Sequence, residues 1–169
     1  MDFILSVGTF NERKNHKSII DAYSLIPLSD RITTYLIRSG PLKDELQQRI
    51  ESRGLSTWIK ILSNVTLPQL RCFYKAANLA IYPSLYEGYG LPVLESLACG
   101  TVVIVHKACA TVEAGGRSVS QVDCTSPEQL AAEIVELRKN KVLQSKYLEE
   151  FIFHLEELRI DKLMKQMNN

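Results

Sequence analysis

The sequence has few of the residues that bind metals or form disulfides. Its 169 residues include four cysteines and three histidines. The cysteines form no CxxC pair and the histidines no HxxxH or HExxH spacing, so we expect no metal site. Cys72 and Cys99 fall inside apolar helical patterns, where we expect buried, reduced thiols. Such cysteine usage is typical of a reducing, cytosolic compartment.

The sequence also lacks a long apolar run and an excess of charge of one sign. No run approaches the length of a membrane span, and residues 1–8 carry no basic stretch or small-residue cleavage site. We therefore predict a cytoplasmic protein with no signal peptide and no integral membrane segment; peripheral membrane association stays open. The formal net charge of +1 gives no global attraction to nucleic acid, so any anion site must be local.

What is present is the composition of a folded domain with alternating strands and helices. The chain is long enough to bury a hydrophobic core, and 46% of its residues are apolar and 23% charged, as in soluble globular proteins. Short β-rich runs with few charges predict the strands of a parallel sheet that is covered on both faces. These runs are residues 3–8, 33–39, 58–62, 79–83, 101–106 and, more weakly, 118–122.

Amphipathic stretches between these runs have apolar residues at helical spacing. They are residues 17–26, 43–53, 67–77, 92–99 and 127–140. Pro68, Pro92 and Pro127 fall near predicted first turns, and Gly54 and Gly100 lie just past two predicted helix ends. The alternation predicts an α/β fold, a doubly wound Rossmann-like parallel sheet, in which ligands bind at the carboxyl ends of the strands.

We divide the chain into a Rossmann-like domain, residues 1–139, and a helical tail of the same domain, residues 140–169. The tail carries a wide apolar stripe on one or two helices. The stripe consists of Leu143, Tyr147, Leu148, Phe151, Ile152, Leu155 and Leu158. Packing on its own domain and contact with a second domain or subunit are equally good interpretations.

The stretch YEGYGLPVLE, residues 86–95, follows the predicted strand 79–83 and leads into a helix. A helix that begins here presents unpaired N–H groups and a partial positive charge to an anion. Gly88 and Gly90 allow a ligand to approach the backbone closely. Glu87 and Glu95 flank this loop, and carboxylates accept hydrogen bonds from pairs of hydroxyl groups. Each glutamate alone is well explained as a solvated charge, but the two together around this loop favour a site for phosphate and sugar oxygens.

EGYGLPVLE resembles the Glu, seven residues, Glu signature of the retaining GT-B glycosyltransferases of family 4. YPSLY before it, LSVGTFNERKNHKSIIDAY near the amino terminus, LIRSG and LACGTVVIV are similar to further motifs of that family. The resemblance covers roughly residues 3–138. It implies that the chain is the carboxyl-terminal, donor-binding half of such an enzyme, with a nucleotide diphosphate sugar as donor and no metal or other cofactor.

The resemblance also implies roles for individual residues. Glu95 would hold the nucleotide ribose, Glu87 would lie by the hydroxyls of the donor sugar, and Lys14 would contact the diphosphate. Backbone amides in one loop would face the sugar and diphosphate; they belong to Gly88, Tyr89, Gly90 and Leu91. The base would lie in the region from Leu62 to Val65.

The physics of the basic pair agrees with this assignment. Negative charge builds on the departing diphosphate in the transition state, so fixed cations such as Arg13 and Lys14 would lower the barrier. Gly8 lies nearby for close backbone approach. Thr9 stands where many relatives have a second phosphate-binding arginine, a role that Arg13 would fill. Gly40 is either another point of close approach or a simple turn.

The resemblance accounts for only one of the two domains that form the active-site cleft in this family. The sequence therefore predicts a partner, an amino-terminal acceptor-binding domain or subunit. We expect a retaining, hexosyl-type glycosyltransferase domain. The alternatives are a non-catalytic module that binds a nucleotide sugar or a protein partner, and one half of a split enzyme.

Overall fold

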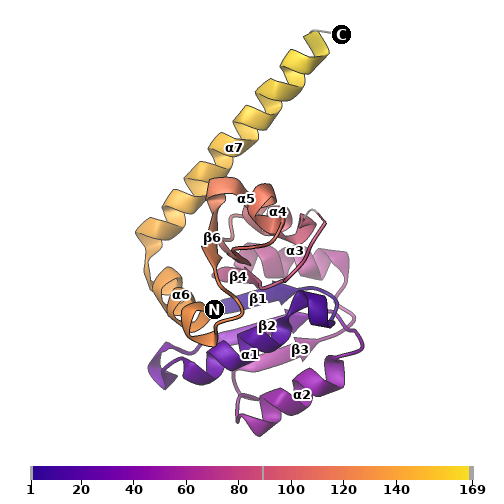
Figure 1. Ribbon diagram of the computed structural model, residues 1–169, viewed down its shortest axis with the longest axis vertical. Coiled ribbons are helices and arrows are strands. Elements are labelled where there is room, and N and C mark those ends of the chain that lie inside the picture. The colour runs from indigo at the N-terminus through magenta and orange to yellow at the C-terminus, as the bar shows by residue number, and fades with distance from the viewer. Residues whose placement is uncertain (1, 89, 168–169) are drawn as a thin grey trace.

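The computed structural model of the chain (Figure 1) describes residues 2–88 and 90–167, with side chains as far as residue 156. Within these residues six parallel strands form one sheet in the order β3-β2-β1-β4-β5-β6. The strands are β1 (Phe3–Val7), β2 (Thr33–Ile37), β3 (Ile59–Leu62), β4 (Leu79–Tyr82), β5 (Val103–His106) and β6 (Val119–Val122). The doubly wound Rossmann-like fold predicted from the sequence is confirmed.

The sheet has its topological switch point between β1 and β4. From β1 the chain proceeds through β2 to β3 on one side, and then returns to add β4, β5 and β6 on the other side. Loops that leave β1 and β4 at their carboxyl ends therefore diverge to opposite faces of the sheet, and the crevice between them is where ligands bind in folds of this kind.

Helices cover both faces of the sheet (Figure 1). They are α1 (His16–Leu25), α2 (Lys43–Ser52), α3 (Leu67–Ala76), α4 (Leu91–Ala98), α5 (Thr111–Gly115), α6 (Pro127–Lys139) and α7 (Lys141–Met167), with the 3-10 turns η1 (Glu12–Lys14), η2 (Leu28–Asp30) and η3 (Gly116–Ser118). Alternate strand residues face opposite layers. Ile4 and Leu36 pack against α1, α2 and α6, whereas Leu5 and Val103 pack against α3, α4 and α7.

Prolines, as predicted from the sequence, and side-chain caps mark the starts of several helices. Pro68, Pro92 and Pro127 all lie in the first turn of a helix. Thr66 and Gln69 form a capping box at the start of α3. The start and end of each predicted helix agree with the structure to within one residue.

Two expectations about the chain are wrong. The run 101–106 becomes a strand only from Val103, because the Thr101 hydroxyl bonds to the carbonyl oxygen of Tyr74 at the end of α3. Cys72 is exposed and Cys99 half-buried. Helix α3 buries Leu70 and Tyr74, four residues apart, and Cys72 lies between these positions on another side of the helix.

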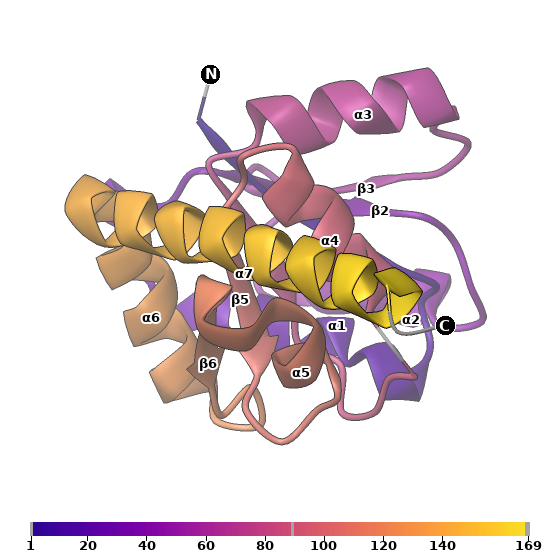
Figure 2. The ribbon, with the colours of Figure 1, turned by 90° about the horizontal axis from the view of Figure 1, so that it is seen from above.

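The tail forms one helix, α7, whose first half packs on the domain. Leu143, Tyr147 and Leu148 are partly buried against the core, and Phe151 is 5% exposed. Ile152 and Leu155 are 59% and 47% exposed, and Leu158 lies outside the described side chains. Helix α7 then extends away from the body (Figure 1), so that in the view from above it lies in front of α4 (Figure 2). Packing on its own domain thus accounts for only part of the apolar stripe.

Candidate functional site

Three of the predicted residues meet at the switch point. Arg13 and Lys14 lie in η1, directly after β1, and Glu87 lies in the loop after β4. Arg13 Nη1 is 2.7 Å from Glu87 Oε2, and Lys14 Nζ forms an ion pair with Glu87 Oε1. The Lys14 and Glu87 side chains are 12% and 11% exposed, so this second pair is largely withdrawn from water.

Further bonds hold the two loops together. The Leu85 N–H donates to the carbonyl oxygen of Arg13 at 2.9 Å, and Arg13 Nη1 donates to that of Tyr86 at 2.8 Å. Asn15, in the left-handed conformation at φ 52°, directs its Nδ2 toward the carbonyl oxygen of Pro83 at 3.3 Å. The basic pair is therefore fixed relative to the β4 loop and can present preorganised charge to an anion.

Glu87 is held as a carboxylate. Burial favours its neutral form, but hydrogen bonds from Lys14, Arg13 and Ser84 outweigh burial and lower the pKa of the Glu87 carboxyl below its ordinary value. The Ser84 hydroxyl donates to Glu87 Oε1 at 2.9 Å. Glu87 thus carries a full negative charge at neutral pH and balances one of the two adjacent cations.

The amino terminus of α4 lies in the same loop. Gly90 precedes Leu91 with φ 82°, and no side chain caps the first amides of the helix. A Cβ at Gly90 would lie 2.9 Å from Cγ2 of Thr111, so both the dihedral and the packing require glycine here. Gly88 has no atom within 4 Å of the position of a Cβ, whereas Leu91 is 62% exposed. Tyr89 lies outside the described residues.

Glu95 lies farther along α4 and faces α3. The Tyr74 hydroxyl donates to Glu95 Oε2 at 2.8 Å. Burial first, and then the nearby Tyr82 and Glu95, raise the pKa of Tyr74 well above its ordinary value, so Tyr74 stays a neutral donor. The second carboxylate of the motif is therefore oriented by a phenol and is not part of the Glu87 ion pairs.

The remaining predicted residues have different surroundings. Gly8 is buried under the stem of Lys14 and next to His16, and Thr9 is exposed. A Cβ at Gly40 would lie 2.5 Å from the carbonyl oxygen of Phe10. Glycine is therefore required here because the backbone at Phe10 passes close to it. The sequence had left a close approach to a ligand and a simple turn open for Gly40.

Leu62 and Val65, in the region predicted for the base, are both half-buried. Between them the Ser63 hydroxyl is buried and has no hydrogen-bond partner among the described residues. Asn64 beside it has φ 60°. This loop at the end of β3 therefore carries a polar group whose bonding the described chain does not satisfy.

Sequence reasoning missed Asn15, Ser84, Tyr74 and His16. Asn15 directly follows the basic pair and precedes a helix, and Ser84 follows a strand three residues before Glu87. These positions were the signal in the sequence that could have identified the two residues. Burial, with a smaller effect of the Lys14 charge, lowers the pKa of His16 to about 3, and its Nδ1 has no partner among the described residues. Nothing in the sequence distinguishes this buried histidine from an exposed one.

The described residues also form a cavity away from the switch point. A cavity of about 630 Å³ is lined by residues of α7 and by Gly116 and Arg117, and none of the predicted donor residues lines it. Among residues 2–88 and 90–156, whose side chains the structure describes, no group of three metal-binding side chains could hold an ion. No helix in this part of the chain is long and apolar enough to cross a membrane.

The order of the six strands is that of the carboxyl-terminal Rossmann-like domain of GT-B glycosyltransferases. The carboxyl-terminal domain of a glycosyl transferase group 1 family protein from Francisella tularensis superposes with a TM-score of 0.74 and 24% identity, over 86% of this chain and 80% of that one. Anabaena HepE, solved in complex with UDP and glucose, superposes with a TM-score of 0.75 and 22% identity, over 86% of this chain and 41% of that one. These likenesses show the fold.

The model of the family "Glycosyl transferases group 1" matches residues 2–152, and the chain belongs to this family. It is 34% identical over 137 residues to the O-antigen chain mannosyltransferase B of Escherichia coli. The aligned segment covers 79% of this chain and 36% of that protein. The chain thus spans about a third of the length of this relative.

Proposed function

We propose that the chain binds a nucleotide diphosphate sugar at the carboxyl edge of its sheet and serves as the donor-binding domain of a retaining glycosyltransferase. The observation that carries the proposal is the convergence of Arg13, Lys14 and Glu87 beside the amino terminus of α4. Two cations and the amino terminus of a helix suit a diphosphate, and a carboxylate among them suits sugar hydroxyls. Family membership and the switch-point position support the same assignment.

Each group has a defined task in this proposal. The bond between the anomeric carbon and the diphosphate oxygen breaks, the oxygen of the acceptor hydroxyl bonds to the same face of that carbon, and the proton of this hydroxyl passes to the departing diphosphate. Lys14, Arg13 and the α4 amides stabilise the negative charge that the diphosphate gains as it leaves. Glu87 accepts hydrogen bonds from the donor sugar, and Glu95 accepts them from the ribose.

The sugar is proposed to be a hexose. The Escherichia coli relative is named as a mannosyltransferase, and this supports mannose as the first sugar to test. Retention of configuration is carried over from the family. A cytoplasmic location belongs to the same proposal, supported by the four cysteines, all of which are free.

Transfer requires an acceptor, and we propose that a second domain or subunit provides its site. The Escherichia coli relative is almost three times as long as the matched segment, which supports this view. Incubating the chain with a nucleotide sugar tests it: hydrolysis or transfer by the chain alone would show that no second domain is needed. Binding without turnover would favour either a split enzyme or the non-catalytic module, and adding a candidate acceptor domain separates these two.

Calorimetric titration with nucleoside diphosphates tests the site. Lys14→Ala should weaken binding at least tenfold because it removes the less exposed of the two cations, and Glu95→Ala should weaken it because the ribose loses its acceptor. Lys17→Ala is the matched control, since Lys17 pairs with Glu12 and Glu45 rather than with Glu87. Unchanged affinity in both Lys14→Ala and Glu95→Ala would remove the basis for the assignment.

A further inference from the structure

Tyr74 differs from the other buried tyrosines of the described chain in what its hydroxyl binds. The Tyr23 hydroxyl donates to a main-chain carbonyl oxygen at 2.7 Å, and the Tyr82 hydroxyl lies 2.9 Å from Ser96 Oγ. Tyr74 is as deeply buried, at 3% exposed, yet its hydroxyl donates to the carboxylate of an exposed residue, Glu95.

The hydrogen bonds of the neighbouring Tyr82 leave Glu95 to Tyr74. The Ser96 hydroxyl gives its only proton to the carbonyl oxygen of Pro92 at 2.9 Å, so Tyr82 is the donor to Ser96. Both buried phenols therefore donate to helix α4, but to different residues. Among the side chains that the structure describes, Tyr74 is the one that forms a hydrogen bond with Glu95.

The position of Tyr74 is fixed by its own surroundings. Its ring belongs to the core layer that also contains Val93 and Leu97 of α4. The Thr101 hydroxyl bonds to its carbonyl oxygen and ties the end of α3 to the segment before β5. A glutamate has several rotatable bonds, and holding it in one rotamer has an entropic cost. Because Tyr74 is itself held, its hydroxyl can restrict Glu95 before any ligand arrives.

Glu95 keeps one oxygen and its charge available. Tyr74 binds Oε2, whereas Oε1 accepts no hydrogen bond and no cation pairs with Glu95 among residues 2–88 and 90–156. Glu87, by contrast, pairs with two cations. Burial raises the pKa of Tyr74, so the phenol stays neutral and does not cancel the charge of the carboxylate. A charged oxygen in a fixed position is a strong acceptor for hydroxyl groups.

We propose that Tyr74 positions Glu95 to accept hydrogen bonds from the hydroxyl pair of a ribose, and thereby makes the site prefer ribonucleotides to 2′-deoxyribonucleotides; the inference rests on the proposed donor-binding function. A freely rotating glutamate would lose rotamer freedom on binding, which offsets part of the gain from the new bonds. Glu95, held by Tyr74, has less freedom to lose. Tyr74 is a positioning residue, since it acts through Glu95.

Calorimetric titration with UDP, GDP and their 2′-deoxy forms measures this preference. Wild type should bind a ribonucleotide roughly tenfold more tightly than its 2′-deoxy form, the value of one hydrogen bond to a charged group. Tyr74→Phe keeps the ring but releases Glu95. Its affinity for the ribonucleotide should therefore fall roughly fivefold while that for the 2′-deoxy form stays the same, which leaves a preference of about twofold.

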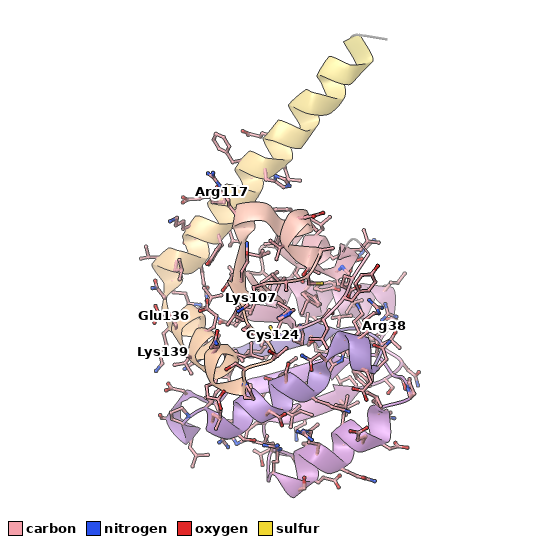
Figure 3. The ribbon with its side chains drawn as sticks, in the orientation of Figure 1. Arg38, Lys107, Arg117, Cys124, Glu136 and Lys139 are labelled. Atoms are coloured by element: carbon pink, nitrogen blue, oxygen red, sulfur yellow. The ribbon has the colours of Figure 1, made fainter. Side chains whose placement is uncertain are left out.

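Two control variants should keep the wild-type affinities. Tyr82→Phe removes a phenol hydroxyl of the same core layer that bonds to Ser96 instead. Its melting temperature should fall about as much as that of Tyr74→Phe, so stability would not explain a difference in binding. Arg117→Ala changes a residue that lies beside α7 (Figure 3) and lines the cavity there. Weaker nucleotide binding by Arg117→Ala would locate the ligand in that cavity and overturn the proposal.

A double variant tests whether Tyr74 acts through Glu95. In the Glu95→Ala background, Tyr74→Phe should change nucleotide affinity by less than about twofold, because the group that it positions is absent. A further large loss there, or equal losses for ribo- and deoxyribonucleotides in Tyr74→Phe alone, would mean that Tyr74 only supports the packing of α3 on α4. An unchanged preference in Tyr74→Phe also overturns this inference but leaves the donor-binding function intact. A wild type that binds no nucleotide overturns both.

Discussion

Glu87 forms ion pairs with Arg13 and Lys14, so a carboxylate occupies both cations that we assign to the diphosphate. A diphosphate must compete with Glu87 for these groups, or share them with it. Each nearby cation also keeps Glu87 ionised, which a sugar-binding acceptor requires. The ion pairs that position Arg13, Lys14 and Glu87 should therefore also reduce the affinity of the site for a diphosphate.

Glu87→Gln separates these roles. Glutamine keeps the shape but removes the charge that competes with phosphate, so the variant should bind a nucleoside diphosphate severalfold more tightly than wild type, and any sugar transfer should fall. Calorimetry with and without the sugar on the donor measures both effects. Weaker binding of the sugar-free nucleotide would show instead that Glu87 mainly holds the loops together.

His16 should make stability depend on pH. Its pKa is about 3 in the folded chain because of burial and Lys14, against 6.5 for an ordinary histidine, so between these values only the unfolded state binds the proton. The free energy of unfolding should therefore fall as the pH is lowered, by about 2 kcal/mol from pH 7 to pH 5. Urea unfolding at several pH values measures this.

His16→Phe keeps an aromatic ring next to Phe10, with which His16 makes an edge contact at 4.9 Å between ring centroids. This variant should lose the fall in stability between pH 7 and pH 5. If wild type and variant show the same dependence, the buried histidine is not its source.

Among the elements, α4 and the loop before it depend most closely on local sequence. Proline in the first turn and glycine before it were visible in the sequence, as was the strand that precedes them, so the position of the loop and of the helix start could be predicted. The pairing of Arg13 and Lys14 with one glutamate could not, because it depends on how two loops 73 residues apart in the sequence meet. Nor could the exposure of Cys72, since a short apolar pattern does not specify which face of α3 is buried.

Gly90→Ala should destabilise the chain. Alanine at φ 82° costs about 1–2 kcal/mol, and its Cβ would also press against Thr111, 2.9 Å away. Gly88→Ala, where a Cβ meets nothing within 4 Å, should change the free energy of unfolding by less than about 0.5 kcal/mol. Denaturant unfolding compares the two, and equal effects would contradict the packing described for Gly90.

The whole molecule consists of a two-layered core on one sheet and a helix that belongs to it only in part. Helix α7 buries Phe151 against the layer that contains α3 and α4, yet it leaves Phe153 66% exposed two residues later. The apolar stripe was predictable from sequence spacing, but the point at which it leaves the domain was not, because this depends on where the supporting surface ends.

Phe151→Ala and Phe153→Ala form a matched pair for the role of α7. Losing the buried ring should lower the free energy of unfolding by about 3–5 kcal/mol, whereas losing the exposed one should change it by less than about 0.5 kcal/mol. Thermal or urea unfolding gives both values. A large loss for Phe153→Ala would mean that the exposed face of α7 is covered in solution.

The central claim is that the carboxyl edge at the switch point binds the donor diphosphate, and backbone amide chemical shifts test its location directly. On titration with a nucleoside diphosphate, the largest shifts should cluster at Lys14 and at the start of α4, around Gly88 and Leu91, and should disappear in Lys14→Ala. Shifts clustered at Arg117 and Lys146, which line the cavity beside α7, or no shifts at all, would contradict the account.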